Sequence, residues 1–278
     1  MAPPGSELAI DAALQAERQF VLTLGGFSLE VAGAALVTHE KVPAPRFNFV
    51  QELGVGRERQ TAFFERALDH YFQRALRPTF RVPLPVPEYL DAGLRRFGFR
   101  PQADPLVLLL AEPGDAGGHA APSGVRAARP SEVDLVASFW TSDAERPEFR
   151  AALENAWSHP NPNEEIVPLL GSRATEPTSA ALVYRYGSTA GIYAVATRPT
   201  ARGQGGASDV VRFATAASVG GRGVRHSIFA DSPRLERRLE ALGFDAARRF
   251  RVYELPASAE LSLPPVGPPG PSRWRPPR

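Results

Sequence analysis

A short strand-like run leads into a glycine-rich turn and then directly into a segment with helical spacing. The run is Ile192–Thr197, the turn is Arg202–Ala207 with the sequence RGQGGA, and the helix-compatible segment spans Gly205–Val219. Glycine lets successive main-chain amides point inward, and the first turn of a helix adds partial positive charge. Strand, glycine-rich turn and helix in this order therefore predict a cradle for phosphate groups within an α/β fold.

Two common phosphate-binding loops do not fit this turn. A Walker-type loop needs a lysine directly after its glycines, and Lys41 is the only lysine in the chain. A dinucleotide-binding loop places its first glycine directly after the strand and ends its pattern on a third glycine. Here about five residues separate the strand from Gly203, and Ser208 stands at the last position of the pattern.

The turn does fit the pattern Arg-x-x-Gly-x-Ala, with Arg202, Gly205 and Ala207 at the three fixed positions. This pattern resembles the acyl-CoA pyrophosphate loop of the GNAT N-acetyltransferases. A simple tight turn is the alternative interpretation, because glycine is common in this chain, with 24 residues.

Two further motifs resemble the same family and occur in the expected order. Val195-x-Thr197-x-Pro199, just before the turn, resembles the fourth strand of the family and its exit, and Leu242-Gly243-Phe244 resembles its Leu-Gly-Phe signature. The resemblance covers residues 125–255. The three motifs together favour a GNAT loop over a plain connection.

The two halves of the chain repeat one order of elements at a constant offset of 145 residues. Without a gap, segments of the first half fall on segments of the second: Phe47–Leu53 on Ile192–Arg198, Phe63–Leu76 on Ser208–Gly221, Leu94–Phe99 on Leu239–Phe244, and Leu106–Leu110 on Arg251–Leu255. Agreement in element order indicates a duplication. The sequence thus predicts a mixed α/β sheet fold with two tandem GNAT-like domains, a layout similar to that of mycothiol synthases.

The domain boundaries follow from composition. We expect a first domain over 1–111 and an acyl-CoA-binding domain over 125–255. A segment rich in glycine, alanine and proline, 112–124, reads as the linker between them, and 256–278 reads as a proline-rich, disordered tail.

The first domain is predicted to be degenerate as a CoA site. At the repeat offset, Glu58 stands where Gly203 stands, and Gln60 stands where Gly205 stands. A Cβ at these positions restricts the positive φ angles that a phosphate cradle uses. The carboxylate of Glu58 would also repel a pyrophosphate.

The resemblance implies direct attack of an amine on an acyl thioester, with acetyl-CoA or another acyl-CoA as co-substrate. It implies that a splayed strand at Val195, Ala196 and Thr197 pairs with the pantetheine arm and presents an amide to the thioester oxygen. It also implies that the pyrophosphate is held by main-chain amides, those of Arg202, Gly203, Gln204, Gly205, Gly206 and Ala207. The Arg202 side chain either adds a charge-assisted hydrogen bond or stays solvated.

Proton transfer has weaker candidates. The family often has a tyrosine acid where this chain has Leu239, which cannot donate a proton. Tyr193 and Glu165 are the candidate catalytic groups; their alternative roles are a packed aromatic ring and a solvated carboxylate. Ser232 either contacts the cofactor or caps the helix that follows it. A non-catalytic acyl-CoA sensor or scaffold is therefore the alternative function.

Composition limits the partners. With no cysteine and no pair of histidines at metal-ligand spacing, we expect no metal site. A net charge of +2, from 32 basic and 30 acidic residues, predicts no general attraction to nucleic acid and argues against a tandem GNAT that uses aminoacyl-tRNA. No apolar run suits a membrane and no signal peptide is apparent, so we expect a cytoplasmic protein. The resemblance implies a small-molecule amine as the acceptor, with an amino acid, an antibiotic, a peptide N-terminus and a protein side chain as open alternatives. We expect a monomer or a homodimer.

Overall fold

The computed structural model describes residues 4–112, 122–140, 146–158, 164–216 and 224–256. The chain forms two compact units, each built from two separate stretches of sequence. The large unit comprises Met1–Gly25 and Val107–Arg248, and the small unit comprises Gly26–Leu106 and Arg249–Arg278. Most of the expected linker and all but the first residue of the expected tail lie outside the described residues.

The large unit contains a mixed sheet. Its strands, in order across the sheet, are β6 (Leu106–Ala111), β11 (Arg225–Ala230), β10 (Thr189–Thr197), β9 (Glu176–Tyr186), β8 (Glu164–Arg173) and β7 (Val125–Ala127). Strands β10 and β11 run parallel, and the other neighbouring pairs are antiparallel. A parallel pair needs a crossover connection, which here is the glycine-rich turn and the helix after it.

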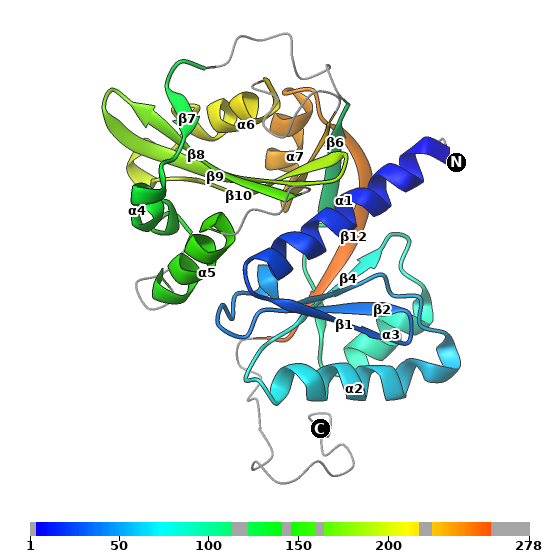
Figure 1. Ribbon diagram of the computed structural model, residues 1–278. Coiled ribbons are helices and arrows are strands. Elements are labelled where there is room, and N and C mark those ends of the chain that lie inside the picture. The colour runs from blue at the N-terminus through cyan, green and yellow to red at the C-terminus, as the bar shows by residue number, and fades with distance from the viewer. Residues whose placement is uncertain (1–3, 113–121, 141–145, 159–163, 217–223, 257–278) are drawn as a thin grey trace. The chain divides into compact units, whose positions relative to one another are not determined.

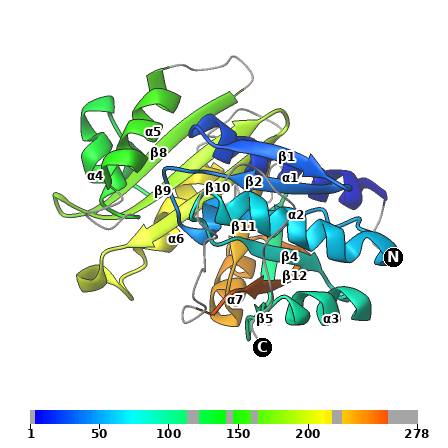
Figure 2. The same cartoon turned by 90° about the horizontal axis from the view of Figure 1, so that it is seen from below.

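The described helices of the large unit are α1 (Pro4–Thr23), α4 (Val133–Ala137), α5 (Arg146–Ser158), α6 (Gly206–Ala216) and α7 (Pro233–Glu240). Helices α4 and α5 pack against each other (Figure 2). No helix in the described part of the chain is long and apolar enough to span a membrane.

Helices α6 and α1 cover opposite faces of this sheet (Figure 1). Successive side chains of a strand point to opposite faces. Ile192 of β10 belongs to the same buried cluster as Val210 of α6, whereas the next residue, Tyr193, stacks on Phe20 of α1. The strand that leads to the glycine-rich turn is therefore fixed from both sides.

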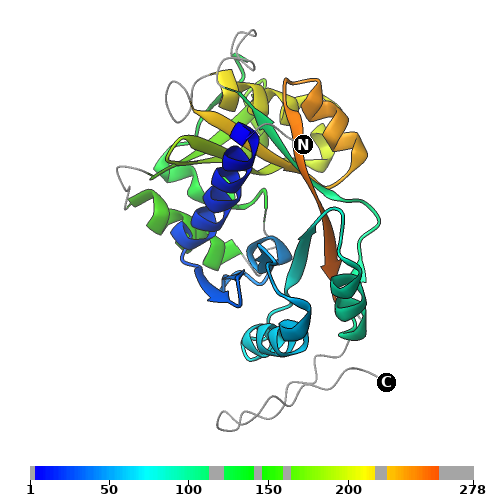
Figure 3. The ribbon, with the colours of Figure 1, turned by 90° about the vertical axis from the view of Figure 1, so that its right-hand side faces the viewer.

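The small unit contains the remaining strands of the one mixed sheet, and two helices. Its strands are β1 (Phe27–Val31), β2 (Ala34–Thr38), β3 (Phe49–Gln51), β4 (Thr79–Pro83), the short β5 (Arg100–Pro101) and the second part of β12 (Asp245–Glu254). Strands β3 and β4 are parallel, as β10 and β11 are in the large unit. Helices α2 (Gln60–Phe72) and α3 (Glu88–Arg96) lie together beside the sheet and appear in cyan and teal in Figure 3.

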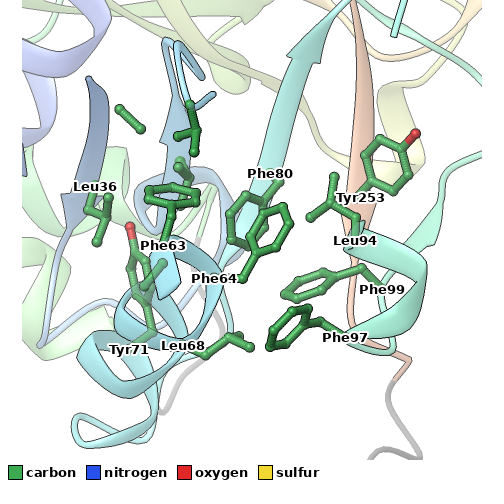
Figure 4. Close-up of a cluster of buried hydrophobic side chains, with 14 of the residues drawn as sticks. Leu36, Phe63, Phe64, Leu68, Tyr71, Phe80, Leu94, Phe97, Phe99 and Tyr253 are labelled. Carbon is green, nitrogen blue, oxygen red and sulfur yellow. The ribbon is translucent and has the colours of Figure 1, made fainter. Parts of the chain in front are cut away.

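Aromatic side chains fill the core of the small unit (Figure 4). Phe64 of α2 meets Phe80 of β4 with ring centroids 5.6 Å apart, and Phe80 meets Phe99 at 4.9 Å, both edge to face. This is the preferred geometry of aromatic pairs. The apolar stripe of the helix that begins at Gln60 is thus core packing, as its spacing predicts.

Each half of the chain supplies its last strand to the unit formed by the other half. Strand β6 ends the first half and pairs with β11 of the large unit. The second part of β12 ends the second half and pairs with β4 of the small unit. The compact units therefore differ from the contiguous ranges 1–111 and 125–255, because a sheet accepts a strand of suitable pattern from any point along the chain. Helix α1 also belongs to the large unit.

Candidate functional site

Strand β10 bulges just before the glycine-rich turn. Its pairing with β9 is regular as far as Tyr193 and resumes at Ala196, and Ala194 between them has a φ of 52°. Its parallel pairing with β11 covers Thr189 to Ile192. The pairing thus ends at Ile192, although β11 continues to Ala230. The contact of Val195, Ala196 and Thr197 with a pantetheine arm stays a prediction.

The turn after β10 has the backbone conformation of a phosphate cradle. Gly203 and Gly205 have φ angles of 83° and 88°, a region that favours glycine. Helix α6 begins at Gly206, and its first amides have no acceptor within the helix. A Cβ on Gly206 would lie 3.0 Å from the hydroxyl oxygen of Ser179, so glycine is also what lets the helix start close to β9.

A pocket of about 260 Å³ opens at this turn. Its walls come from the end of β10, the turn, the first turn of α6 and one face of α7: Thr197, Ala201, Arg202, Gly203, Gly205, Gly206, Ala207, Ser208, Arg234 and Arg238. The hydroxyl of Thr197 is buried and has no hydrogen-bond partner among the described residues. Main-chain amides, a hydroxyl and three guanidinium groups suit an anion that carries phosphate groups.

Arg173, at the end of β8, braces the turn from outside the pocket. Its guanidinium group donates to the main-chain carbonyl of Gln204 and, at 2.9 Å, to the carboxylate of Asp209 in the first turn of α6. Arg212 lies 3.6 Å from the same carboxylate. The carbonyl of Gln204 is thereby occupied, and the one acidic group of this helix turn is neutralised.

The sequence analysis missed Arg173, Arg234 and Arg238. The two arginines of α7 are four residues apart, and α7 follows β11, which is parallel to β10. Because the carboxyl ends of adjacent parallel strands lie at one edge of a sheet, the helices that follow them begin close together. That rule, applied to the i, i+4 arginine pair, could have identified both residues; Arg173 carried no comparable signal.

All the candidate cofactor-binding residues except Ser232 lie at the end of β10, in the glycine-rich turn or at the start of α6. Val195, Ala196 and Thr197 are half-buried at the bulged end of β10. Arg202, Gly203, Gly205, Gly206 and Ala207 line the pocket, and Gln204 lies between them in the exposed turn. Ser232 instead caps α7, because its hydroxyl accepts the amide of Leu235 at 3.4 Å. Of its two predicted roles, the structure shows the cap.

The two candidate catalytic residues do not come together. The ring of Tyr193 stacks on Phe20 at 4.4 Å and 9°. Glu165 faces Arg185 across β8 and β9 with a 3.7 Å ion pair, and this row of the sheet continues to Ala190. Ala190 lies four residues before the bulge at Ala194, which corresponds to about 13 Å along the strand. Glu165 is therefore about this far along the sheet from the bulge. Leu239 is buried in the apolar core.

Other proton-transfer groups and metal ligands are scarce. His226 of β11 is buried, and burial lowers its pKa below the ordinary histidine value. The part of the chain that the structure describes holds no cluster of three or more histidine, aspartate or glutamate residues able to bind a metal.

In the small unit, side chains occupy the positions that correspond to the pocket. Gln60, the counterpart of Gly205, donates to the main-chain carbonyl of Tyr89 and lies against Gly93. Tyr89 and Gly93 are the counterparts of Arg234 and Arg238 at the repeat offset of 145. The hydroxyl of Tyr89 donates to the carbonyl of Val55 at 3.0 Å, which ties α3 to the segment before α2.

No family model and no curated protein matches this sequence. Solved structures do match. A GCN5-related N-acetyltransferase from Kribbella flavida is similar with a TM-score of 0.62 and 19% identity, over 91% of this chain and 98% of that one. A functionally unknown conserved protein from Staphylococcus epidermidis gives 0.63 and 12%, over 84% and 94%. The chain has the GNAT fold.

A tandem GNAT protein from the clavulanic acid biosynthesis pathway is also similar, with a TM-score of 0.52 and 14% identity over 74% of each chain. The predicted mixed α/β GNAT fold is confirmed, and one of its structural relatives is itself a tandem protein. The likeness to mycothiol synthases and the degeneracy of the first half stay predictions.

Proposed function

We propose that this protein is an acyl-CoA-dependent N-acyltransferase that transfers an acyl group, acetyl in the simplest case, to a primary amine of a small molecule. The observation that carries the proposal is the combination of a bulged β10, two glycines at positive φ and the free first amides of α6 around one pocket. Each element alone is common. Their combination at the end of β10, beyond its pairing with β11, supports a diphosphate site there.

The diphosphate of the cofactor would bind to the amides of Gly203 to Ala207. The partial charge at a helix N-terminus contributes about 0.3–1 kcal/mol toward an anion at an exposed site, and more when the site is partly buried. The bracing of Gln204 and Asp209 by Arg173 supports this role, because it keeps a carbonyl and a carboxylate engaged away from the ligand.

The pantetheine arm would run along β10 where it parts from β11, so that an amide of Val195, Ala196 or Thr197 faces the thioester oxygen. A hydrogen bond that strengthens as negative charge develops on that oxygen is worth about 2.7–4 kcal/mol in other acyl-transfer enzymes. The amine nitrogen attacks the thioester carbon, the C–S bond breaks, and the amide product forms while the amine loses a proton and the thiolate gains one.

The proton-transfer step has few protein groups available. Tyr193 is the candidate next to the bulge, although its ring is stacked on Phe20. The position of Glu165 in an exposed ion pair far along the sheet does not favour a catalytic role. Orientation of two substrates in one complex can supply much of a rate enhancement without a dedicated acid or base. The second candidate, a non-catalytic acyl-CoA sensor, is motivated by Leu239, which cannot donate a proton where the resembled family often has a tyrosine.

Acetyl-CoA binding tests the site. Isothermal titration of the wild type should show binding, and Gly205→Glu should weaken it by more than about tenfold, because the variant places a side chain and a negative charge in the cradle. The matched control is Gly187→Glu: Gly187 also has positive φ, 57°, with open space around it, but lies in the β9–β10 turn. No binding by the wild type, or equal loss in both variants, would contradict the proposal.

Turnover separates the two candidate functions. A panel of primary amines is incubated with acetyl-CoA and the protein, and release of free CoA is followed. Amine-dependent release supports the acyltransferase, and binding without release from any amine supports the sensor.

A further inference from the structure

Two arginines of α7 face the phosphate cradle. Arg234 and Arg238 are about 40° apart around the helix axis, since an α-helix turns about 100° per residue. Both line the pocket, opposite the first turn of α6. Both are exposed, as is Arg202 on the turn itself.

These three guanidinium groups have no carboxylate partner among the described residues, whereas many other arginines of the protein do. Asp209, the nearby acid in the first turn of α6, is already bonded by Arg173 and Arg212. Glu236 and Glu240 of α7 lie about 120° or more around the helix from either pocket arginine. The pocket therefore carries unbalanced positive charge.

The amount of charge indicates what the pocket accommodates. Three guanidinium groups and a helix N-terminus amount to about 3.5 positive charges. A diphosphate diester supplies about two negative charges, and a phosphate monoester beside it adds about 1.5 to 2 more. A ligand that carries both groups balances the pocket, and a diphosphate alone does not.

We infer that Arg234 and Arg238 bind the 3′-phosphate of the cofactor's ribose. The protein would then accept thioesters of 3′-phosphorylated CoA and discriminate against dephospho-CoA and against acyl groups carried on phosphopantetheine alone. This inference rests on the proposed function and specifies its co-substrate.

The small unit provides an internal comparison. At the repeat offset, Tyr89 and Gly93 replace the two arginines, and Gln60 fills the space of the cradle. The half without an open cradle also lacks the pair of cations. The arginines therefore accompany the open pocket and are not a general feature of this helix.

The experiment measures the affinities of CoA and of 3′-dephospho-CoA for three proteins by isothermal titration. The wild type should prefer CoA by about 10- to 100-fold, the range for hydrogen bonds to charged groups. The double variant Arg234→Ala/Arg238→Ala should lose this preference and bind 3′-dephospho-CoA about as the wild type does. Arg237→Ala is the matched control, because Arg237 lies on the same helix, is exposed and does not line the pocket.

Equal affinity of the wild type for the two ligands would overturn the inference and leave the proposed function intact. Equal weakening of both ligands in the double variant would also overturn it, because the arginines would then serve the diphosphate. If the wild type bound neither ligand, the proposed function itself would fail. The ratio of the two wild-type affinities decides the matter even if the double variant does not fold.

Discussion

At the scale of single residues, the proposed phosphate cradle depends on three glycines and on Arg173. Gly203 and Gly205 supply the positive φ angles, and Gly206 lets α6 begin close to β9. Arg173 then holds the carbonyl of Gln204 and the carboxylate of Asp209. In the proposed function, these contacts would prepare the turn for an anion before any ligand binds.

Replacement of Arg173 by alanine should weaken acetyl-CoA binding by about tenfold. The change frees the carbonyl of Gln204 and leaves Asp209 less well balanced beside the diphosphate, and a charge-assisted hydrogen bond is worth about 1.5–3 kcal/mol. Acetyl-pantetheine, which has no phosphate, should bind the variant and the wild type equally well. Titration with both ligands measures the two effects.

Arg150→Ala is the control for this prediction, because Arg150 forms comparable ion pairs with Asp134 and Glu154 away from the pocket. It should leave both affinities unchanged. If Arg173→Ala reduced the affinity for acetyl-pantetheine as much as that for acetyl-CoA, Arg173 would have a general structural role and would not orient the phosphate-binding turn.

At the scale of elements, β10 matters most, because its pairing with the neighbouring strands changes along its length. As far as Ile192 it is an ordinary inner strand, paired on both sides. The bulge at Ala194 then shifts its register against β9, and its pairing with β11 stops. A bulge re-aims a strand in this way, so in the proposed function the same element would contribute to the core and to the binding edge.

Ala194→Val should disturb this edge. Valine is strongly disfavoured at the φ of 52° that residue 194 adopts, so the bulge should shift or the protein should lose about 1–3 kcal/mol of stability. Acetyl-CoA and acetyl-pantetheine should both bind more weakly, since both use the strand edge. Denaturant unfolding and titration measure the two effects.

Ala32→Val provides the matched control. Ala32 also has a φ of 52° but lies in the turn between β1 and β2 of the small unit. This variant should lose stability and keep wild-type affinity for both ligands. Similar binding losses in both variants would show that strain alone, and not the edge of β10, weakens binding.

At the scale of the whole molecule, the two halves of the predicted duplication differ at the positions of the pocket. The pocket of the large unit is lined by Arg234 and Arg238 of α7, and the small unit has Tyr89 and Gly93 at the same positions, with Gln60 beside them. A hydrogen-bonded glutamine side chain fills the space that a diphosphate would need. We therefore propose that each chain binds one cofactor.

The sequence predicts those elements whose pattern lies within a few neighbouring residues. The predicted strand Ile192–Thr197 forms the second part of β10, and the helix expected after the glycine-rich turn begins at Gly206, one residue later than predicted. Partners distant in the chain could not be predicted. The hydropathy of β6 and β12 does not specify which strands they pair with. It also does not specify that the ring of Phe20 stacks on the ring of Tyr193. Helix α5, Arg146–Ser158, was not predicted, although its buried residues Phe149, Leu153 and Ala156 recur at the helical spacing i, i+4 and i+7.

A crystal structure with acetyl-CoA tests the central claim most directly. The account predicts one cofactor per chain, bound to the large unit, with diphosphate oxygens about 2.7–3.2 Å from amides of Gly203 to Ala207 and the thioester between β10 and β11. A cofactor whose diphosphate lies elsewhere, while the amides of the glycine-rich turn bind only solvent, would contradict it.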